Sequence, residues 1–256
     1  MKKEADRLRA VVLARTDYGE AHVIVDFLTR ERGRMGGMAK HGRKSRKRFG
    51  NALVPGSVVE MAFRPRRAGE LVLLESGELL RSFEGLSRDP RLLGLAGLAL
   101  ETVEAFCKPL DPAPEIFDLL LWTLDRFDRA ERVEEALLVF HLKLLRAAGF
   151  GPNLLRCSVC GRREIEAGRG WGLQIEAGGL ACLSCAPGGF EASPGTVKIM
   201  ALIQSLDLDR IGRVKVGETA LGQGAPFLEA YVRHHLGRDL RSARFLEQLA
   251  RRPPSG

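Results

Sequence analysis

The sequence predicts an α+β protein built from more than one domain. Three observations support this fold class: short apolar runs between glycine-bearing turns fill residues 1–80, helical periodicity begins at Leu86, and two cysteine pairs interrupt the helical part. A chain of 256 residues also exceeds the usual size of one domain. The predicted division is 1–80, 81–152, 153–190, 191–250 and 251–256, in which the second and fourth segments form one helical domain and the last is a frayed tail.

The first segment predicts five short strands. β-branched and apolar residues occupy residues 8–13, 23–28, 34–39, 57–63 and 70–74. The turns at residues 17–20 and 30–33 are short enough to join antiparallel neighbours, so the first three strands are expected to form a meander. Five strands in so short a segment favour a closed barrel, because closure leaves no exposed edge. The oligonucleotide-binding (OB) fold is the most common five-stranded barrel, so we expect an OB-fold β-barrel here.

The later segments predict an α-helical domain around a cysteine-rich insertion. Residues 90–106, 114–127 and 131–148 repeat apolar side chains at helical spacing, and Gly149 ends the third run. After the cysteines, Ser193-Pro194 combines an N-cap with a proline in the first turn, which predicts a helix to about residue 206. Two further helices are expected near residues 226–236 and 239–249.

Four of the five cysteines form two Cys-x-x-Cys pairs, Cys157 with Cys160 and Cys182 with Cys185, with 21 residues between the pairs. Two thiolates at this spacing can face one point, and two such pairs supply the tetrahedral ligand set of a structural Zn²⁺. The sequence therefore predicts an inserted four-cysteine zinc ribbon with one structural zinc ion and no open coordination position. Reduced thiols, two disulfides or a redox pair are the alternatives. Cys107 lies on the apolar face of a predicted helix and is expected to be a small core residue.

Positive charge is concentrated near the N-terminus, where residues 1–80 hold 17 Lys and Arg against 10 Asp and Glu and so carry most of the net charge of +8. Residues 40–48, called the basic segment below, hold six Lys and Arg and no acidic residue after the third predicted strand. Such a patch attracts phosphates, and OB barrels bind nucleic acid on strands two and three and the nearby loops. A solvated loop, a localisation tract or contact with an anionic membrane also fits the charge. Other residues that can extend the patch or stack on bases are Arg30, Arg32, Arg34, Arg64, Arg66, Arg67, Tyr18 and Phe49.

The sequence holds none of the common enzyme motifs. It has no phosphate-binding loop, dinucleotide fingerprint, zinc-protease helix, nucleophile elbow or paired acidic motif of a two-metal nuclease. No stretch has the length and apolar character of a membrane span, and the N-terminal residues do not form a secretory signal, so a cytoplasmic location is expected. A non-enzymatic nucleic-acid-binding protein is the favoured interpretation. A sequence-specific DNA-binding adaptor or regulator and a zinc-stabilised nucleic-acid-modifying enzyme are the alternatives.

Several motifs follow one another in an order that is specific as a set. They are Gly19-Glu20-Ala21-His22-Val23-Ile24-Val25, Leu28-Thr29-Arg30-Glu31-Arg32-Gly33-Arg34, the basic segment with Phe49-Gly50, Leu53-Val54-Pro55, Gly149-Phe150-Gly151-Pro152-Asn153-Leu154, Cys157-x-x-Cys160-Gly161 and Gly178-Gly179-Leu180-x-Cys182-x-x-Cys185. In this order the chain resembles the RecO family of bacterial recombination mediator proteins over nearly its whole length. Val54 departs from the family pattern, in which an acidic residue is expected before the proline.

The resemblance implies an OB barrel that binds single- and double-stranded DNA, and a helical domain with a zinc ribbon. Members of the RecO family anneal complementary strands without ATP, including strands coated by single-strand-binding protein. With RecR they help to load the RecA recombinase in DNA repair, so a place at the bacterial nucleoid is expected. The C-terminal tail of single-strand-binding protein is expected on the helical domain, where a basic residue among Arg126, Arg129 and Arg132, or Arg233 and Arg238, would contact it. Carried onto this sequence, the implied DNA contacts are Arg34, Lys40, Arg43, Lys44, Arg46, Lys47 and Arg48, and the implied zinc ligands are Cys157, Cys160, Cys182 and Cys185.

Overall fold

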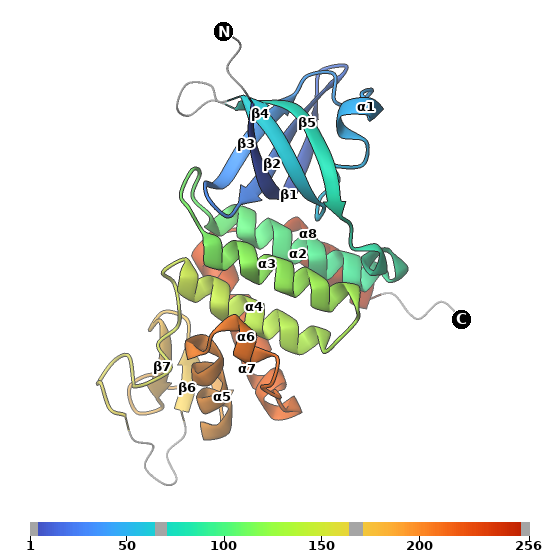
Figure 1. The fold of residues 1–256 in the computed structure, drawn as a ribbon. Coiled ribbons are helices and arrows are strands. Elements are labelled where there is room, and N and C mark those ends of the chain that lie inside the picture. The colour runs from blue at the N-terminus through green and yellow to red at the C-terminus, as the bar shows by residue number, and fades with distance from the viewer. Residues whose placement is uncertain (1–4, 65–70, 164–170, 252–256) are drawn as a thin grey trace. The chain divides into compact units, whose positions relative to one another are not determined.

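The computed structural model describes residues 5–64, 71–163 and 171–251 (Figure 1). Arg66, Arg67, the first residue of the fifth predicted strand and the tail from residue 252 lie outside the described residues. The chain forms two compact units, Met1–Glu131 with Leu240–Gly256, and Arg132–Asp239. The finer division drawn from the sequence stays a prediction. Among the helices of the described residues, none combines the length and apolar character that a membrane crossing requires.

Five strands close into a barrel in the first unit (Figure 1). They are β1 (Asp6–Tyr18), β2 (His22–Thr29), β3 (Gly33–Ala39), β4 (Val58–Arg64) and β5 (Val72–Arg81), in the order β1-β2-β3-β5-β4. The β3–β5 pair is parallel, and the other four pairs, including β1–β4, are antiparallel. The predicted five-stranded OB-like barrel with its β1-β2-β3 meander is confirmed.

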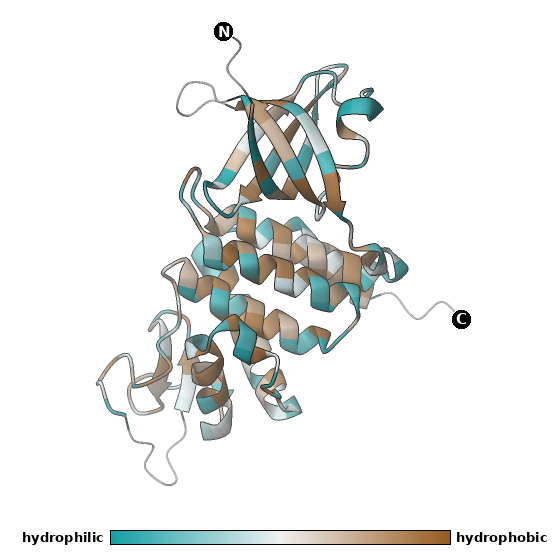
Figure 2. Ribbon diagram, viewed as in Figure 1, coloured by the Kyte–Doolittle hydropathy of each residue, from teal (hydrophilic) through white to brown (hydrophobic). Residues whose placement is uncertain are grey.

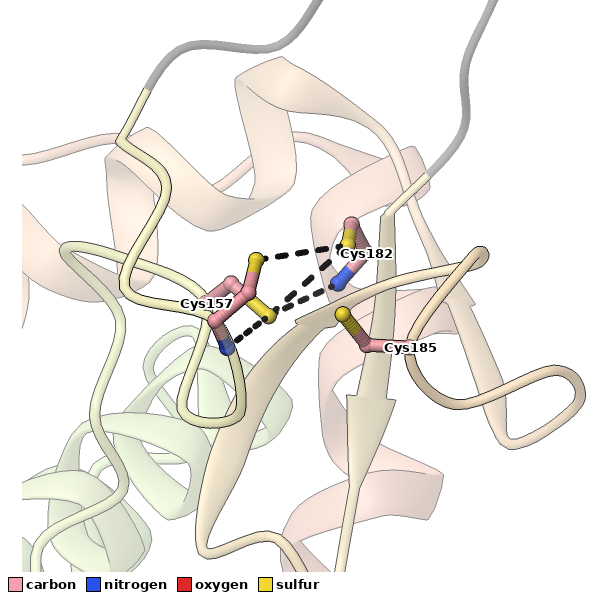
Figure 3. A group of neighbouring side chains, drawn as sticks. Cys157, Cys182 and Cys185 are labelled. Carbon is pink, nitrogen blue, oxygen red and sulfur yellow. Dashed lines mark hydrogen bonds between the residues drawn. The ribbon is translucent and has the colours of Figure 1, made fainter.

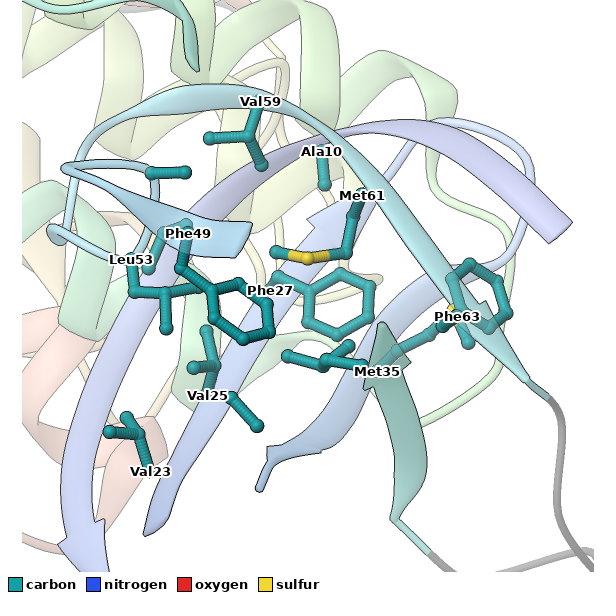
Figure 4. Packing of buried hydrophobic residues seen from close by; sticks show 14 of the residues in the cluster. Ala10, Val23, Val25, Phe27, Met35, Phe49, Leu53, Val59, Met61 and Phe63 are labelled. Atoms are coloured by element: carbon teal, nitrogen blue, oxygen red, sulfur yellow. The ribbon is translucent and has the colours of Figure 1, made fainter. Parts of the chain in front are cut away.

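The barrel interior is filled because side chains on each strand alternate between its two faces. In β2, Val23, Val25 and Phe27 are completely buried, while the residues between them are partly exposed. Figure 4 shows these side chains inside the barrel, in one cluster with Met61 and Phe63 of β4. Phe49 also points inward and is only 3% exposed, so it is part of this core although it belongs to no strand.

Two barrel elements differ from the prediction. The fifth strand was expected to end at residue 74 but runs to Arg81, because its backbone stays paired with β4 as far as Val58. Residues 75–78 are mostly polar, so the apolar pattern gives no sign of this extension. The basic segment was expected to be a loop, yet its last three residues form the short helix α1 (Arg46–Phe49) together with Phe49, and this helix is largely hydrophilic in Figure 2. Burial of Phe49 fixes the end of that helix.

The first unit also contains η1 (Glu84–Arg88), α2 (Pro90–Phe106), α3 (Pro114–Asp128) and α8 (Arg241–Ala250). The Glu101 carboxylate accepts hydrogen bonds from the backbone N–H groups of Arg241 and Ser242, both at 3.0 Å, and so caps α8 on α2. Cys107 is buried at the end of α2, and burial raises the pKa of its thiol to about 11. It is the core residue that the sequence predicts.

The second unit contains α4 (Val133–Ala147), β6 (Trp171–Gln174), β7 (Gly179–Cys182), β8 (Phe190–Ala192), α5 (Pro194–Ser205), α6 (Leu208–Ile211) and α7 (Glu218–Leu236). Ser193 caps α5 as predicted, since its hydroxyl accepts from the Thr196 N–H at 3.1 Å. The predicted start of α7 near Pro226 is wrong, because the helix begins at Glu218 and holds the proline inside it. Pro226 leaves the Gly222 carbonyl without its helical partner, and solvent can satisfy it because Gly222 is exposed.

His141 makes the second unit sensitive to acid. It is 3% exposed in α4, its Nε2 has no hydrogen-bond partner within the described residues, and burial lowers its pKa to about 4. The unfolded chain takes up a proton near the ordinary histidine pKa of about 6.5, so folding stability is lost as the pH falls from there towards the folded value.

Replacing this histidine by leucine is expected to remove that loss. Between pH 7 and pH 5 the linkage amounts to about 2 kcal/mol of unfolding free energy. Urea unfolding of the wild type and of His141→Leu at both pH values checks it, and any metal-linked pH effect is common to both proteins. An equal pH-dependent loss in the two proteins would contradict the assignment.

Candidate nucleic-acid interface and metal site

The basic segment is fixed to the barrel by its backbone. The His41 N–H donates to Nδ1 of His22 at 3.1 Å, and the Arg43 N–H donates to the Ala21 carbonyl at 3.2 Å. Phe49 then anchors the far end of the segment in the barrel core. The segment therefore has a defined path over the ends of β2 and β3.

Most of the cations of the basic segment are exposed on the surface. Arg48 is partly buried: it donates to Ser45 Oγ at 2.9 Å and to the Lys40 carbonyl, and its guanidinium lies 5.0 Å from the centre of the Phe49 ring. Arg43 lies 3.4 Å from the Asp17 carboxylate, which draws it towards the β1–β2 hairpin. The exposed cations of the segment are Lys40, Arg43, Lys44, Arg46 and Lys47. Exposed cations such as these can bind the phosphates of a nucleic-acid backbone.

Arg34 has different surroundings from the other six predicted DNA contacts. Its side chain is 26% exposed, Nη1 donates to the Glu104 carbonyl at 2.5 Å, and Nε lies 3.7 Å from Asp26. These contacts tie β3 to α2 within the first unit. Its role in DNA binding stays a prediction that the local contacts do not favour.

The arginines expected to extend the patch are paired with carboxylates wherever the structure describes them. The pairs are Arg30 with Asp118 at 3.1 Å, Arg32 with Asp6 at 2.8 Å and Arg64 with Glu75 at 2.5 Å. Exposed pairs like these contribute little to stability, but each carboxylate competes with a phosphate for its arginine. The sequence gives no sign of the Asp118 partner, which lies on α3 far along the chain.

The two candidate stacking residues separate clearly. Phe49 is buried in the barrel core, so it cannot offer a face to a base, and that prediction is wrong. Its position after six cations in the sequence is typical of a surface residue, but its ring is buried inside the barrel. Tyr18 at the end of β1 is 54% exposed and stays a candidate.

The four paired cysteines converge on one point in the second unit, and Figure 3 labels three of them. All four sulfurs lie within 4.8 Å of one another, and Cys182 Sγ is 3.8 Å from the sulfurs of both Cys157 and Cys160. A tetrahedral zinc site with metal–sulfur bonds of about 2.3 Å has sulfur–sulfur edges of about 3.8 Å. The cysteines are free rather than joined as disulfides. This geometry fits a metal ion held by four thiolates.

The protonation of these thiols also favours a cation. Burial raises the pKa of Cys157, but the backbone N–H groups of Cys160 and Cys182 donate to its sulfur and bring the pKa down to about 6. Hydrogen bonds with the sulfurs of Cys182 and Cys160 raise the pKa of Cys185 to about 12. Ionisation of one thiol therefore disfavours ionisation of its neighbours. A divalent cation between the sulfurs would allow all four to be thiolates.

A small sheet holds the two cysteine pairs in place. β6 lies between β7 and β8, and Trp171 of β6 pairs with Cys182 of β7. Asn153 bridges to β7 through its N–H to the Gly178 carbonyl at 2.9 Å and its carbonyl to the Leu180 N–H at 2.8 Å. A Cβ on Gly179 would lie 2.4 Å from the Asn153 oxygen, so glycine is required there. The ribbon-like insertion that the sequence predicts is present.

Comparison with protein families agrees with this architecture. The family model described as "Recombination protein O N terminal" matches residues 1–83, and "Recombination protein O C terminal" matches residues 87–244. This chain belongs to the RecO family. The two RecO models together cover the barrel, nearly all of the helical part and the cysteine insertion, so the resemblance found in the motifs is confirmed over nearly the whole length.

Curated RecO relatives extend over almost all of the chain. The DNA repair protein RecO of Anaeromyxobacter sp. (strain K) is 35% identical over 248 residues, which cover 95% of this chain and 96% of that protein. The RecO protein of Desulfatibacillum aliphaticivorans is 34% identical, and the match covers 95% of this chain and 96% of that protein. The RecO protein of Syntrophobacter fumaroxidans is 35% identical, and the match covers 94% of this chain and 97% of that protein. The chain is thus a RecO protein of DNA repair and recombination.

Proposed function

We propose that this RecO family member is a DNA-binding recombination mediator that acts by binding and not by catalysis. It binds single- and double-stranded DNA, anneals complementary strands without ATP and helps to load the recombinase onto coated single strands. The observation that carries this proposal is the set of five exposed cations that the folded basic segment gathers on the barrel. A protein with this role acts on chromosomal DNA, so we expect it at the nucleoid in the cytoplasm.

The mechanism needs charge and position but no reacting group. Annealing is limited by repulsion between two polyanionic strands, and cations that neutralise phosphates bring the strands close enough to pair. Base pairing then supplies the free energy, which is why no nucleotide hydrolysis is needed. Lys40, Lys44, Arg46 and Lys47 are the strongest candidates for phosphate contact, because their side chains make no hydrogen bond or ion pair with other described residues. Arg43 can exchange Asp17 for a phosphate, and Arg48 orders the segment.

The metal is proposed to be zinc with a structural role. Cys157, Cys160, Cys182 and Cys185 would hold it, and four protein ligands leave no position for water or substrate. Partner proteins follow from the family: a RecR-type mediator, the C-terminal tail of single-strand-binding protein and, indirectly, the RecA recombinase. The helical part is the expected site for that tail, and we assign no residues to it.

The rate at which two complementary labelled oligonucleotides anneal without ATP tests the function. Three proteins are compared: the wild type, a four-cation variant (Lys40→Ala, Lys44→Ala, Arg46→Ala, Lys47→Ala) and a control variant that loses four exposed cations of the second unit (Lys198→Ala, Arg210→Ala, Arg213→Ala, Lys215→Ala). The wild type and the control are expected to accelerate annealing, and the four-cation variant is expected to lose at least about tenfold in rate. No acceleration by the wild type over protein-free strands would refute annealing as an activity.

A further inference from the structure

Tyr18 and His22 lie side by side on the outer face of the barrel. They are direct cross-strand partners at the end of the β1–β2 hairpin, and directly opposed residues of an antiparallel pair point to the same face. Val23 is buried inside the barrel, so the preceding side chain, His22, points outward, and Tyr18 points outward with it. Tyr18 is 54% exposed, whereas the other aromatic residues of the described barrel, Phe27, Phe49 and Phe63, are buried.

His41 continues this arrangement across the barrel. It follows β3, its ring centre lies 5.0 Å from that of His22, and its backbone N–H donates to His22 Nδ1. Three rings, from Tyr18 at the end of β1, His22 at the start of β2 and His41 just after β3, thus lie at one end of the barrel. This set, called the ring row below, lies at the beginning of the basic segment, since Lys40 and Arg43 flank His41.

We propose that the ring row is a base-binding platform, on which the Tyr18 ring stacks against an unpaired base of a single strand whose phosphates the basic segment holds. This inference rests on the proposed function and adds the feature that distinguishes single-stranded from duplex DNA. In a duplex both faces of each base are covered by neighbouring bases, so an exposed ring finds a free face only on a single strand. Aromatic platforms beside a cationic groove are how proteins hold single strands without reading sequence.

The three rings have separate tasks in this proposal. Tyr18 is the contacting residue, because it is exposed whereas the phenylalanines of the described barrel are buried. His22 is a positioning residue: its hydrogen bond with the His41 backbone sets the start of the basic segment relative to the β1–β2 hairpin. The Arg43–Ala21 backbone bond adds a second tie between the same two elements. Bases on Tyr18 and phosphates on the basic segment are therefore held at a fixed spacing.

Strands with and without bases test the platform. Fluorescence anisotropy measures binding of a labelled oligothymidine and of an equally long strand made of abasic sites, which keeps the phosphates and lacks the rings. The wild type and Tyr18→Phe are expected to bind the base-bearing strand at least about fivefold more tightly than the abasic strand. Tyr18→Ala is expected to lose this preference and keep the wild-type affinity for the abasic strand and for duplex DNA. Thermal melting checks that the exposed substitution leaves the fold intact.

The outcomes separate this inference from the proposed function. If Tyr18→Ala keeps the full preference for base-bearing strands, the platform is refuted, and the proposed function still stands provided that the four-cation variant loses binding. If Tyr18→Ala weakens binding to both strands equally, Tyr18 acts on the segment's structure and the stacking proposal is overturned. A wild type that binds neither strand would overturn both.

Discussion

Loss of the metal is expected to unfold the ribbon of the second unit and to leave the barrel folded. The three ribbon strands span four, four and three residues, too few to form a stable sheet without further support. A structural zinc ion supplies roughly 10–16 kcal/mol of apparent binding free energy in small domains, and this becomes folding free energy when the site exists only in the folded state. Cys157→Ser removes one ligand and leaves three crowded thiols without their cation.

Trp171 reports this event directly. Its indole is 4% exposed in β6, and its backbone pairs with Cys182, so unfolding of the ribbon brings the ring into water. In a Trp122→Phe background it is the one remaining tryptophan of the sequence. Cys157→Ser is expected to lower the zinc content from one per chain to near zero and to shift the Trp171 emission to longer wavelength. Binding of DNA by the barrel should change by less than about twofold, because the basic segment lies in the other unit.

The matched control is Cys107→Ser, which alters the cysteine outside the two pairs. Its thiol is buried in the first unit with its pKa raised by burial, so it does not supply a metal ligand. This variant should keep one zinc per chain and the wild-type Trp171 emission. A Cys157→Ser protein with the same zinc content and emission as the control would exclude the four-cysteine site as the metal centre.

Features that depend on neighbouring residues could be predicted from the sequence. The alternation in β2, the N-cap at Ser193 and the two Cys-x-x-Cys spacings each lie within a few residues, and all three agree with the structure. The cysteine pairs are informative even at long range, because a tetrahedral metal demands four ligands at one point. The resemblance of the ordered motifs to the RecO family then supplied the function, which spacing and charge alone left open between a binder, a regulator and an enzyme.

Features set by contacts between distant residues could not be predicted. Arg34 lies in β3, and Arg46 follows that strand closely in sequence. Arg34 donates a hydrogen bond to the Glu104 carbonyl of α2, whereas Arg46 is exposed on the surface. Phe49 follows a run of cations but fills the barrel core, and polar residues 75–78 extend β5 because β4 pairs with them. In each case the deciding partner is remote in sequence, so local pattern carries no information about it.

The salt dependence of DNA binding is the sharpest test of the basic segment. Five exposed cations that each neutralise one phosphate of a single strand predict a slope of log K against log salt of about −3.5. The four-cation variant keeps only Arg43 of this set, so it should flatten the slope to about −0.7 and lower the affinity at 0.1 M salt by about a hundredfold to a thousandfold. The loss should be the same for unrelated sequences, because phosphate contacts carry no base information.

The salt slope distinguishes direct contact between DNA and the basic segment from attraction of DNA by the net charge of the protein. The control variant removes the same charge from the second unit, so a protein that merely attracts DNA through its net charge would lose affinity equally in both variants. Contact through the basic segment instead predicts a flattened slope in the four-cation variant and a wild-type slope in the control, because only cations that displace counterions from the strand enter the slope. Alanine favours helix, so α1 should survive the substitutions, and Arg48 and Phe49, which anchor the segment, are unchanged. An unaltered slope in the four-cation variant would mean that the segment is solvated in the complex and that DNA lies on another face of the protein.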